Sequence, residues 1–490
     1  PLFAPELPGH AERLDTALRD ARPTAVLTTS RAREAIESFL DGTALPERPA
    51  VIAIDQVPDA AAADFQPTLI DVDDVSHLQY TGGATRAPVG VEITHRAVGT
   101  NLLQMILSID LLDRNTHGVS WLPLYHDMGL SMIGFPAVYG GHSTLMAPTA
   151  FIRRPLRWIE ALSAGSRIGR VVTAAPNFAY EWTAQRGVPG DAGDVDLSNV
   201  VMIIGSEPVS ISAIDTFRRA FTPFGLSPSA FKPSYGLAEA TLFVSTIDPG
   251  TEVSVVHLDR GCLSEGRAVP VAAGDPAALP VVSCGHIARS LSCVIVDPPS
   301  RSEQPDGFVG EIWLQGDNVG RGYWGRAEET AHTFGGRLAA TNEAGGHASG
   351  ATLDRAWLRS GDLGFYLEGE LYVVGRLADL VVVSGRSHYP HDIEATAASA
   401  SPLVRRGYIA AFTVPGEPLE RLVIVAERAT GTARADPAAA VAEIRTAVED
   451  RHGLPVADVR VVPAGSIPRT TSGKLARLAC RDAYVAGAFG

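Results

Sequence analysis

The segment Tyr80–Val91, YTGGATRAPVGV, has the composition of a loop that binds phosphate. A strand-like stretch leads into its glycine and threonine residues, and a helix pattern with Thr94 as N-cap follows. Backbone amides and hydroxyl groups of such a loop can surround phosphate oxygens. Most glycine-rich turns are only turns, so this segment alone leaves both interpretations open.

A histidine and an aspartate follow a predicted strand. In WLPLYHDMGLSMIGFPAVYGG (121–141) the strand is predicted to end at Tyr125, directly before His126 and Asp127. Ligands of open α/β sheets bind beyond the carboxyl ends of strands, so His126 is a candidate pocket residue. The alternative is a His–Asp pair that caps a core helix.

Acidic residues in two glycine-containing turns have the chemistry to bind other parts of a nucleotide. Glu239 in SYGLAEAT (234–241) is a candidate Mg²⁺ ligand, or an acidic residue favoured by a helix N-terminus. Asp362 in RSGDLG (359–364) is a candidate for binding two vicinal ribose hydroxyls, or the first residue of an Asx turn.

Only two of the 41 basic residues are lysines, Lys232 and Lys474. The preference for arginine indicates a GC-rich coding bias, so a retained lysine is a candidate for a site that needs a compact ammonium group. Lys474 follows a Thr/Ser/Gly turn and precedes an apparent terminal helix. A flexible, exposed lysine is the alternative.

Composition excludes several classes of protein. A length of 490 residues predicts at least two domains, and 46% hydrophobic residues indicate a globular chain. The net charge of -14 argues against a nucleic-acid partner. No apolar run is long enough to span a bilayer. The four cysteines show no CxxC spacing and are expected to be core thiols in the cytoplasm.

Three successive sequence patterns predict the elements that position these residues. Apolar runs such as 24–29, 169–176 and 199–207 alternate with helix patterns, which indicates a largely parallel sheet. Short strands with Gly, Pro and Asp turns fill about 253–375, and a compact α+β unit follows Arg376. We therefore predict an α/β fold: a large domain at 1–375 of mixed and parallel sheets flanked by helices, with a β-rich subdomain, and a small domain at 376–490.

Taken in order, these segments resemble the adenylate-forming superfamily of acyl-CoA synthetases, peptide-synthetase adenylation domains and luciferases. The resemblance covers about residues 1–487. It is strongest to the fatty-acyl-AMP ligase branch, and within that branch to ligases of actinobacterial mycolic-acid synthesis. The motifs that carry it are WLPLYHDMG, PLRWIEALS, AAPNFAYE, GSEPVS, SYGLAEATLFVS, GDNVGRGYW and GRSHYPHDIEA.

The resemblance implies a role for each motif. The phosphate loop would consist of Thr81, Gly82, Gly83, Ala84, Thr85 and Arg86. The adenine pocket would be lined by Gly205, Ser206 and Glu207. Adenine and the α-phosphate would be bound by Ser234, Tyr235, Gly236, Leu237, Ala238 and Glu239. Asp362 would hold the ribose hydroxyls with the help of Arg376. The catalytic candidates are Lys474, Glu239 as the Mg²⁺ contact, and His126.

The implied reaction joins a long-chain fatty acid to AMP, with ATP and Mg²⁺ as cofactors and pyrophosphate as product. The implied acceptor is the acyl carrier domain of a polyketide synthase. Segments 128–140 and 174–180 are candidate walls of an acyl tunnel, although a plain core helix is the competing interpretation.

The chain departs from the family pattern at three places. Gly82 and Ala84 replace the two serines of the phosphate loop, Val89 replaces its lysine, and much of the region before the loop is missing. Three hypotheses remain: a fatty-acyl-AMP ligase, an acyl-CoA synthetase, and an impaired homologue that only binds nucleotide or lipid. The long segment 334–357 and Ala378 at the usual hinge position favour carrier loading over CoA.

Overall fold

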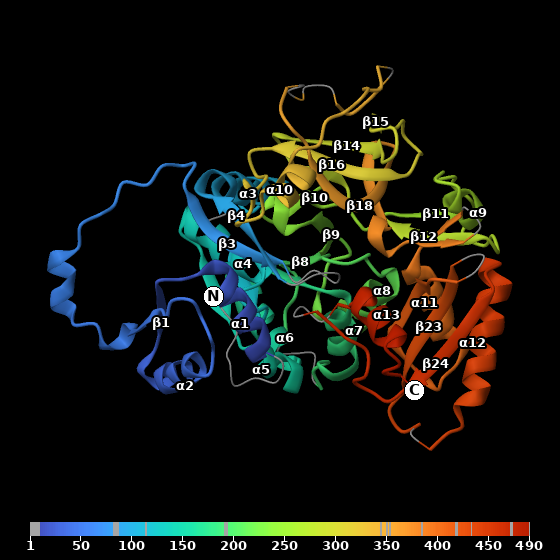
Figure 1. Ribbon diagram of the computed structural model, residues 1–490, viewed down its shortest axis with the longest axis horizontal. Coiled ribbons are helices and arrows are strands. Elements are labelled where there is room, and N and C mark those ends of the chain that lie inside the picture. The colour runs from blue at the N-terminus through green and yellow to red at the C-terminus, as the bar shows by residue number, and fades with distance from the viewer. Residues whose placement is uncertain are drawn as a thin grey trace.

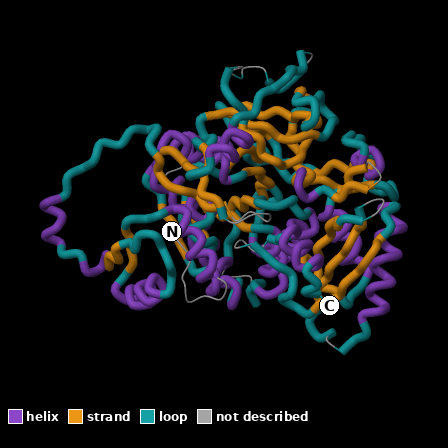
Figure 2. Tube along the Cα trace, viewed as in Figure 1, coloured by secondary structure: helices purple, strands orange, loops and turns teal. Residues whose placement is uncertain are grey.

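The computed structural model of the chain (Figure 1) describes most of its residues. The described ranges are 10–81, 88–112, 115–190, 195–343, 345–348, 351, 354–383, 386–416, 420–432, 434–470 and 474–489. Figure 2 shows both helices and strands across the molecule. Between about residues 253 and 376 the elements are mostly strands.

A seven-stranded sheet in the order β13-β10-β9-β8-β7-β5-β6 holds the largest apolar core. β6, β5, β7, β8 and β9 run parallel to one another, and β10 is antiparallel to both of its neighbours, β9 and β13. β7 and β8 are buried throughout, as their continuous apolar sequences predict. The bounds are β5 (His117–Ser120), β6 (His142–Leu145), β7 (Val171–Ala175), β8 (Val200–Ile204), β9 (Phe231–Gly236), β10 (Phe243–Thr246) and β13 (His286–Ile287).

Helices join and cover these strands. They are α3 (His95–Ser108), α4 (Asp127–Tyr139), α5 (Pro148–Arg153), α6 (Leu156–Ser166), α7 (Asn177–Arg186) and α8 (Ile211–Phe221). The predicted N-cap Thr94 is confirmed, because its side chain accepts from the Ala97 amide; the side chain of Ser210 caps α8 in the same way, accepting from the Ala213 amide.

The segment before β3 forms a small parallel pair with two helices. It contains α1 (His10–Ala21), β1 (Ala25–Thr28), α2 (Ser30–Asp41) and β2 (Ala50–Ala53). Ser30 precedes the helical pattern at 31–40 and is of a residue type that favours the N-cap, but it is the first residue of α2 and not its N-cap. Its hydroxyl donates to Asp55 at 2.5 Å, and Thr29 occupies the cap position without a side-chain bond.

The strand-rich region consists of short antiparallel sheets. The five-stranded sheet contains β14 (Leu291–Asp297), β15 (Ser302–Glu303), β16 (Gly310–Gly316), β18 (Leu358–Leu367) and β19 (Glu370–Arg376). β11 (Val255–Asp259) and β12 (Ala278–Val282) form a two-stranded antiparallel sheet. A three-stranded sheet has the order β17 (Gly322–Tyr323), β4 (Val89–Thr94) and β3 (Val75–Thr81). The helices of this region are α9 (Arg260–Ser264) and α10 (Ala327–Phe334).

The residues after Arg376 have an apolar core of their own, built mainly from β22, β23, α11 and α12. The elements are β20 (Val381–Val383), β21 (Arg386–His388), α11 (Pro390–Ala400), β22 (Val404–Val414), β23 (Arg421–Arg428), α12 (Pro437–His452), β24 (Val456–Val462) and α13 (Arg477–Val485). Asp436 caps α12 as predicted, because its carboxylate accepts from the Ala438 amide. We call residues 376–490 the C-terminal unit; its separation as a domain stays a prediction.

The structure confirms the predicted α/β class: mixed sheets, largely parallel at the centre, flanked by helices. Within the described residues, no helix combines the length and apolarity needed to cross a bilayer. Part of the long segment 334–357 is bonded to the five-stranded sheet. The carboxylate of Glu303 in β15 accepts hydrogen bonds from the backbone amides of Asn342, His347 and Ala348.

Candidate active site

One cavity of about 2850 Å³ lies at the carboxyl ends of β5, β7, β8 and β9, between the central sheet and the C-terminal unit. It brings together most of the predicted residues from segments far apart in the sequence. They are His126, Ser206, Glu207, Ser234, Tyr235, Gly236, Leu237, Ala238, Glu239, Asp362, Arg376 and Lys474. Thr81 is the last residue of β3, and Gly82–Arg86, the rest of the predicted phosphate loop, lie outside the described residues.

The turn after β8 is held in a strained backbone conformation. Ser206 has a φ of 69°, which side-chain-bearing residues rarely adopt. Gly205 lies behind the cavity wall, where an added Cβ would stand 2.4 Å from the Ser234 carbonyl oxygen. The turn therefore requires glycine at 205 to approach the end of β9 closely.

Glu207 continues this turn into the cavity. Its Oε1 accepts a hydrogen bond of 3.0 Å from the Asn177 amide. The Asn177 side chain donates to the Pro208 carbonyl and accepts from the Ser210 amide, so Asn177 fixes the loop that follows β8. Burial raises the pKa of Glu207, and the charge of Lys474 acts in the opposite direction.

The segment Ser234–Glu239 ends β9 and forms a second wall. Gly236 approaches the Leu242 carbonyl so closely that a Cβ would lie 1.9 Å from its oxygen. Glu239 lies in a short 3₁₀ turn, and its Oε1 accepts the hydroxyl proton of Tyr323 at 2.9 Å. Burial raises the pKa of Glu239. The carboxylate is therefore placed where a nearby cation would favour its ionised form.

Asp362 lies in β18 and not in the predicted turn, directly opposite Arg376 of β19 in the antiparallel register. Its Oδ1 accepts from Arg376 Nε at 2.9 Å, and its Oδ2 accepts from the Tyr235 hydroxyl at 2.8 Å. The charge of Asp362 raises the pKa of Arg376. Strand pairing thus supplies the Asp–Arg pair that the motifs placed at one site.

The His126–Asp127 pair lies at the N-terminus of α4, and His126 also lines the cavity, so both interpretations of this segment apply. Its Nδ1 lies 2.6 Å from Oδ1 of Asp127, a separation that requires a proton between them. The Met128 amide is 2.7 Å from the same carboxylate and 3.3 Å from Nδ1, so we assign its hydrogen bond to Asp127. The predicted strand end at Tyr125 is wrong, because β5 ends at Ser120.

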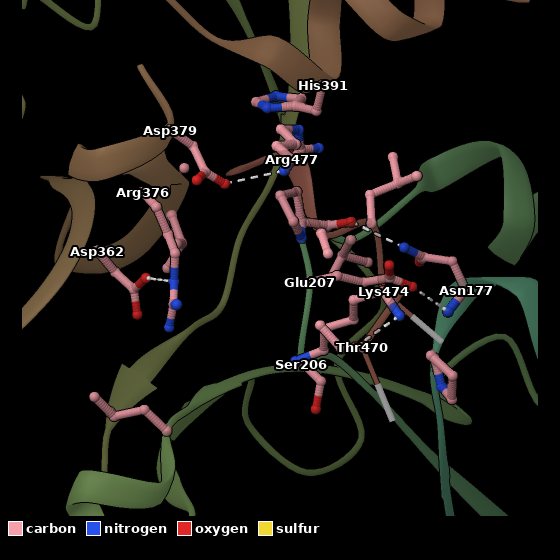
Figure 3. Close-up of a pocket in the computed structure, with 18 of the residues that line it drawn as sticks. Asn177, Ser206, Glu207, Asp362, Arg376, Asp379, His391, Thr470, Lys474 and Arg477 are labelled. Carbon is pink, nitrogen blue, oxygen red and sulfur yellow. Dashed lines mark hydrogen bonds and ion pairs between the residues drawn. The ribbon is translucent and has the colours of Figure 1, made fainter. Parts of the chain in front are cut away.

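Lys474 enters the cavity from the C-terminal unit (Figure 3). Its backbone forms two hydrogen bonds with Thr470: the Lys474 amide donates to Thr470 Oγ1 at 3.1 Å, and the Thr470 amide donates to the Lys474 carbonyl at 2.9 Å. Burial lowers the pKa of Lys474, while the carboxylates of Asp127 and Glu207 favour its charged form. Lys474 is thus a half-buried side chain near acidic residues of the segments that follow β5 and β8.

The structure adds three residues that the sequence interpretation did not assign. Asn177 fixes Glu207, Tyr323 binds Glu239, and Asp127 contributes a negative charge near Lys474. Asn177 and Tyr323 lie within the motifs AAPNFAYE and GDNVGRGYW, so the motifs marked their segments but not their contacts.

Apolar side chains line another part of the cavity. Leu130 and Ile133 of α4 face it, as do Phe178 and Trp182 of α7. Both segments proposed as tunnel walls, 128–140 and 174–180, therefore contribute to the cavity, and α4 also packs into the core through Met132 and Phe135.

Comparison with known proteins agrees with this arrangement. A family model described as AMP-binding enzyme matches residues 7–324. The long-chain-fatty-acid–AMP ligase FadD32 of Mycolicibacterium smegmatis is 45% identical over all of this chain and 81% of its own length. FadD26 of Mycobacterium marinum, also named a long-chain-fatty-acid–AMP ligase, is 39% identical over all of this chain and 83% of its own.

A solved structure from work on fatty acyl-adenylate ligases of E. coli and L. pneumophila has a TM-score of 0.83 and 28% identity. The match covers 98% of this chain and 82% of that chain. The fold, the cavity and the relatives lead to one assignment: the chain belongs to the AMP-binding enzyme family, in the branch of the fatty-acyl-AMP ligases.

Proposed function

We propose that the chain joins a long-chain fatty acid to AMP and then transfers the acyl group to the phosphopantetheine thiol of an acyl carrier domain. The observation that carries this proposal is Lys474, which enters the same cavity as the loops after β8 and β9 and the Asp362–Arg376 pair. The names of the relatives support the fatty acid as substrate.

In the first step a carboxylate oxygen attacks the α-phosphorus of ATP. The bond from this phosphorus to the bridging oxygen breaks, and pyrophosphate leaves with the electron pair. Lys474 stabilises the charge that develops between the carboxylate and the α-phosphate. Such electrostatic stabilisation by a preorganised group is usually the largest single contribution to catalysis. In the second step the thiol sulfur attacks the acyl carbon, AMP leaves, and the thiol proton passes to solvent.

The nucleotide is divided among the motifs. The turn at 205–207 lines the adenine pocket, and the segment 234–239 binds adenine and the α-phosphate. Asp362 accepts hydrogen bonds from the ribose hydroxyls, while Arg376 keeps its carboxylate oriented. The phosphate loop is assigned to Thr81–Arg86 by sequence alone. His126 lines the cavity beside Asp127 and helps to position the reacting carboxylate.

Glu239 fits a magnesium ligand. Its carboxylate lines the cavity, and burial raises its pKa. The Tyr323 hydroxyl donates a hydrogen bond to one of its oxygens and so fixes the side chain. Mg²⁺ usually takes one or two carboxylates together with phosphate oxygens and water. Consistent with that, the described residues contain no group of three or more His, Cys, Asp or Glu that could hold a metal. When bound, the ion offsets negative charge on the phosphates.

The apolar lining fits an alkyl chain. Each methylene removed from water contributes about 0.8 kcal/mol, so contacts with α4 and α7 give a long acid substantial affinity. We place this reaction in the cytoplasm, in agreement with four cysteines that are free thiols.

The products of one incubation test the proposal. The protein is incubated with ATP, Mg²⁺ and fatty acids of graded length, with CoA, with a phosphopantetheinylated carrier domain, or with neither. We expect acyl-AMP that persists with CoA and is consumed by the carrier. Formation of acyl-CoA would favour an acyl-CoA synthetase, and a folded protein that forms no adenylate would favour a binding-only homologue.

A further inference from the structure

A buried ion pair, Arg260–Asp392, joins the strand-rich region to the C-terminal unit, and both of its residues line the same large cavity as the nucleotide motifs. Arg260 of α9 contacts Asp392 of α11 through two bonds, Nε to Oδ2 at 2.5 Å and Nη2 to Oδ1 at 3.1 Å. Their side chains are only 12% and 8% exposed. The 132 positions between them make this a contact between distant parts of the chain.

The surroundings fix both partners. Arg260 also donates to the Ala277 carbonyl at 3.1 Å, which holds the guanidinium on the strand-rich side. His452 of α12 lies 3.7 Å from Asp392, but burial lowers its pKa to about 4, so it is neutral near pH 7. Its Nε2 bonds the hydroxyl of Thr396 at 2.8 Å. The charge that balances Asp392 near neutral pH therefore comes from Arg260.

A chain of contacts leads from Asp392 to Lys474. Asp392 and Glu394 share the first turns of α11, and Glu394 binds Arg477 through two contacts of 2.7 Å. Arg477 starts α13, three residues after Lys474, and also binds Asp379 at 3.1 Å (Figure 3). The helix that Arg260 holds is thus the helix that holds the segment carrying Lys474.

We infer that Arg260 and Asp392 are positioning residues for adenylation: their pair fixes the C-terminal unit in the orientation that places Lys474 in the cavity. This inference rests on the proposed function. Neither residue needs to touch substrate, because a displacement of about 1 Å at a reacting group is enough to slow a reaction about 100-fold. The transfer step as proposed above gives no role to Lys474, so under this inference it does not require the pair.

The variants Arg260→Gln and Asp392→Asn separate the two half-reactions. We expect the kcat of acyl-AMP formation to fall about 10- to 100-fold with the KM for ATP within about threefold. Transfer from supplied acyl-AMP to the carrier thiol stays at or above the wild-type rate. Arg260→Lys, which keeps the charge, recovers part of the loss.

Arg386→Gln is the matched control, because Arg386 pairs with Glu265 at the same interface at 3.3 Å but with side chains 60% and 45% exposed. An exposed pair contributes little, so this variant keeps adenylation within about twofold of wild type. Equal loss of both half-reactions in Arg260→Gln, or no loss, would overturn the inference.

Hydrogen exchange of the peptide around Leu377–Leu380 provides a readout that needs no activity. We expect faster exchange in Arg260→Gln than in wild type or Arg386→Gln, and equal exchange in all three would contradict the inference. If wild type forms no acyl-AMP, the proposed function fails, while this comparison still tests the ion pair.

Discussion

At the scale of single residues, the two lysines show how position decides the use of one functional group. Lys474 lines the cavity together with Asp127 and Glu207, so its ammonium group has acidic neighbours and borders a space that can hold substrate. Lys232 is 1% exposed in β9, and its Nζ donates to the Asp248 carbonyl at 2.7 Å. Scarcity of lysine marked both residues and the family resemblance selected Lys474; the structure adds that Lys232 is buried and bonded to backbone carbonyl oxygen.

Lys474→Ala is expected to lower the rate of acyl-AMP formation by about 100- to 1000-fold, as for the loss of other preorganised groups that stabilise developing charge. The affinity for ATP should change little, because the proposed adenine and ribose contacts remain. Single-turnover product formation and calorimetric ATP binding measure the two effects. Turnover at the wild-type rate would remove Lys474 from the mechanism.

Lys232→Met is the matched lysine variant, and it should leave adenylation by the folded protein unchanged. Burial lowers the pKa of Lys232 to about 8 from its ordinary value of 10.5. Between these values the unfolded chain binds more protons than the folded chain, so the contribution of Lys232 to stability rises with pH. Denaturant unfolding measured from pH 7.5 to 10 should give a free energy of unfolding that rises with pH more steeply in wild type than in Lys232→Met. Parallel dependences on pH in the two proteins would contradict the assignment.

Asp362→Asn is expected to raise the KM for ATP at least about tenfold, because hydrogen bonds to a charged acceptor contribute about 1.5–3 kcal/mol each. Tyr235→Phe removes one hydrogen bond to the same carboxylate but leaves the proposed bonds to the ribose in place, so its effect on the KM for ATP should be smaller. Initial rates at varied ATP measure both. A larger effect of Tyr235→Phe than of Asp362→Asn would argue against ribose binding by Asp362.

At the scale of elements, sequence patterns predicted strands best where burial is uniform. β7 and β8 consist of continuous apolar residues, so their position and the polar turns after them followed from the sequence. β5 was predicted too long, because Pro123 lacks the amide that a central strand needs. The glycines around Asp362 indicated a turn, but the segment pairs with β16 and β19 and is accommodated within β18 by irregularities in the register, with Gly361 at a φ of 70°.

Gly205→Ala tests the close approach of β8 and β9. The new methyl would stand 2.4 Å from the Ser234 carbonyl oxygen, so backbone must shift at the proposed adenine turn. We expect a loss of about 1–3 kcal/mol in stability and weaker ATP binding. Gly274→Ala is the control, since a Cβ there meets nothing within 4 Å. Thermal unfolding that is equal for the two variants would contradict the role of Gly205.

At the scale of the whole molecule, the cavity belongs to neither part of the chain alone. The central sheet and the strand-rich region supply its walls, and the C-terminal unit supplies Lys474. The resemblance to the adenylate-forming family predicted which segments meet, since it gives each motif a role at one nucleotide site. The Arg260–Asp392 pair was not predictable, because nothing local in either segment indicates a partner 132 positions away.

Fatty-acid-dependent exchange of labelled pyrophosphate into ATP tests the central claim most directly, because it requires reversible formation of the acyl-adenylate. With wild-type protein and Mg²⁺ we predict exchange that requires a long-chain acid, needs no CoA and is lost in Lys474→Ala. A folded wild-type protein that shows no exchange, or the same exchange without fatty acid, would contradict the account.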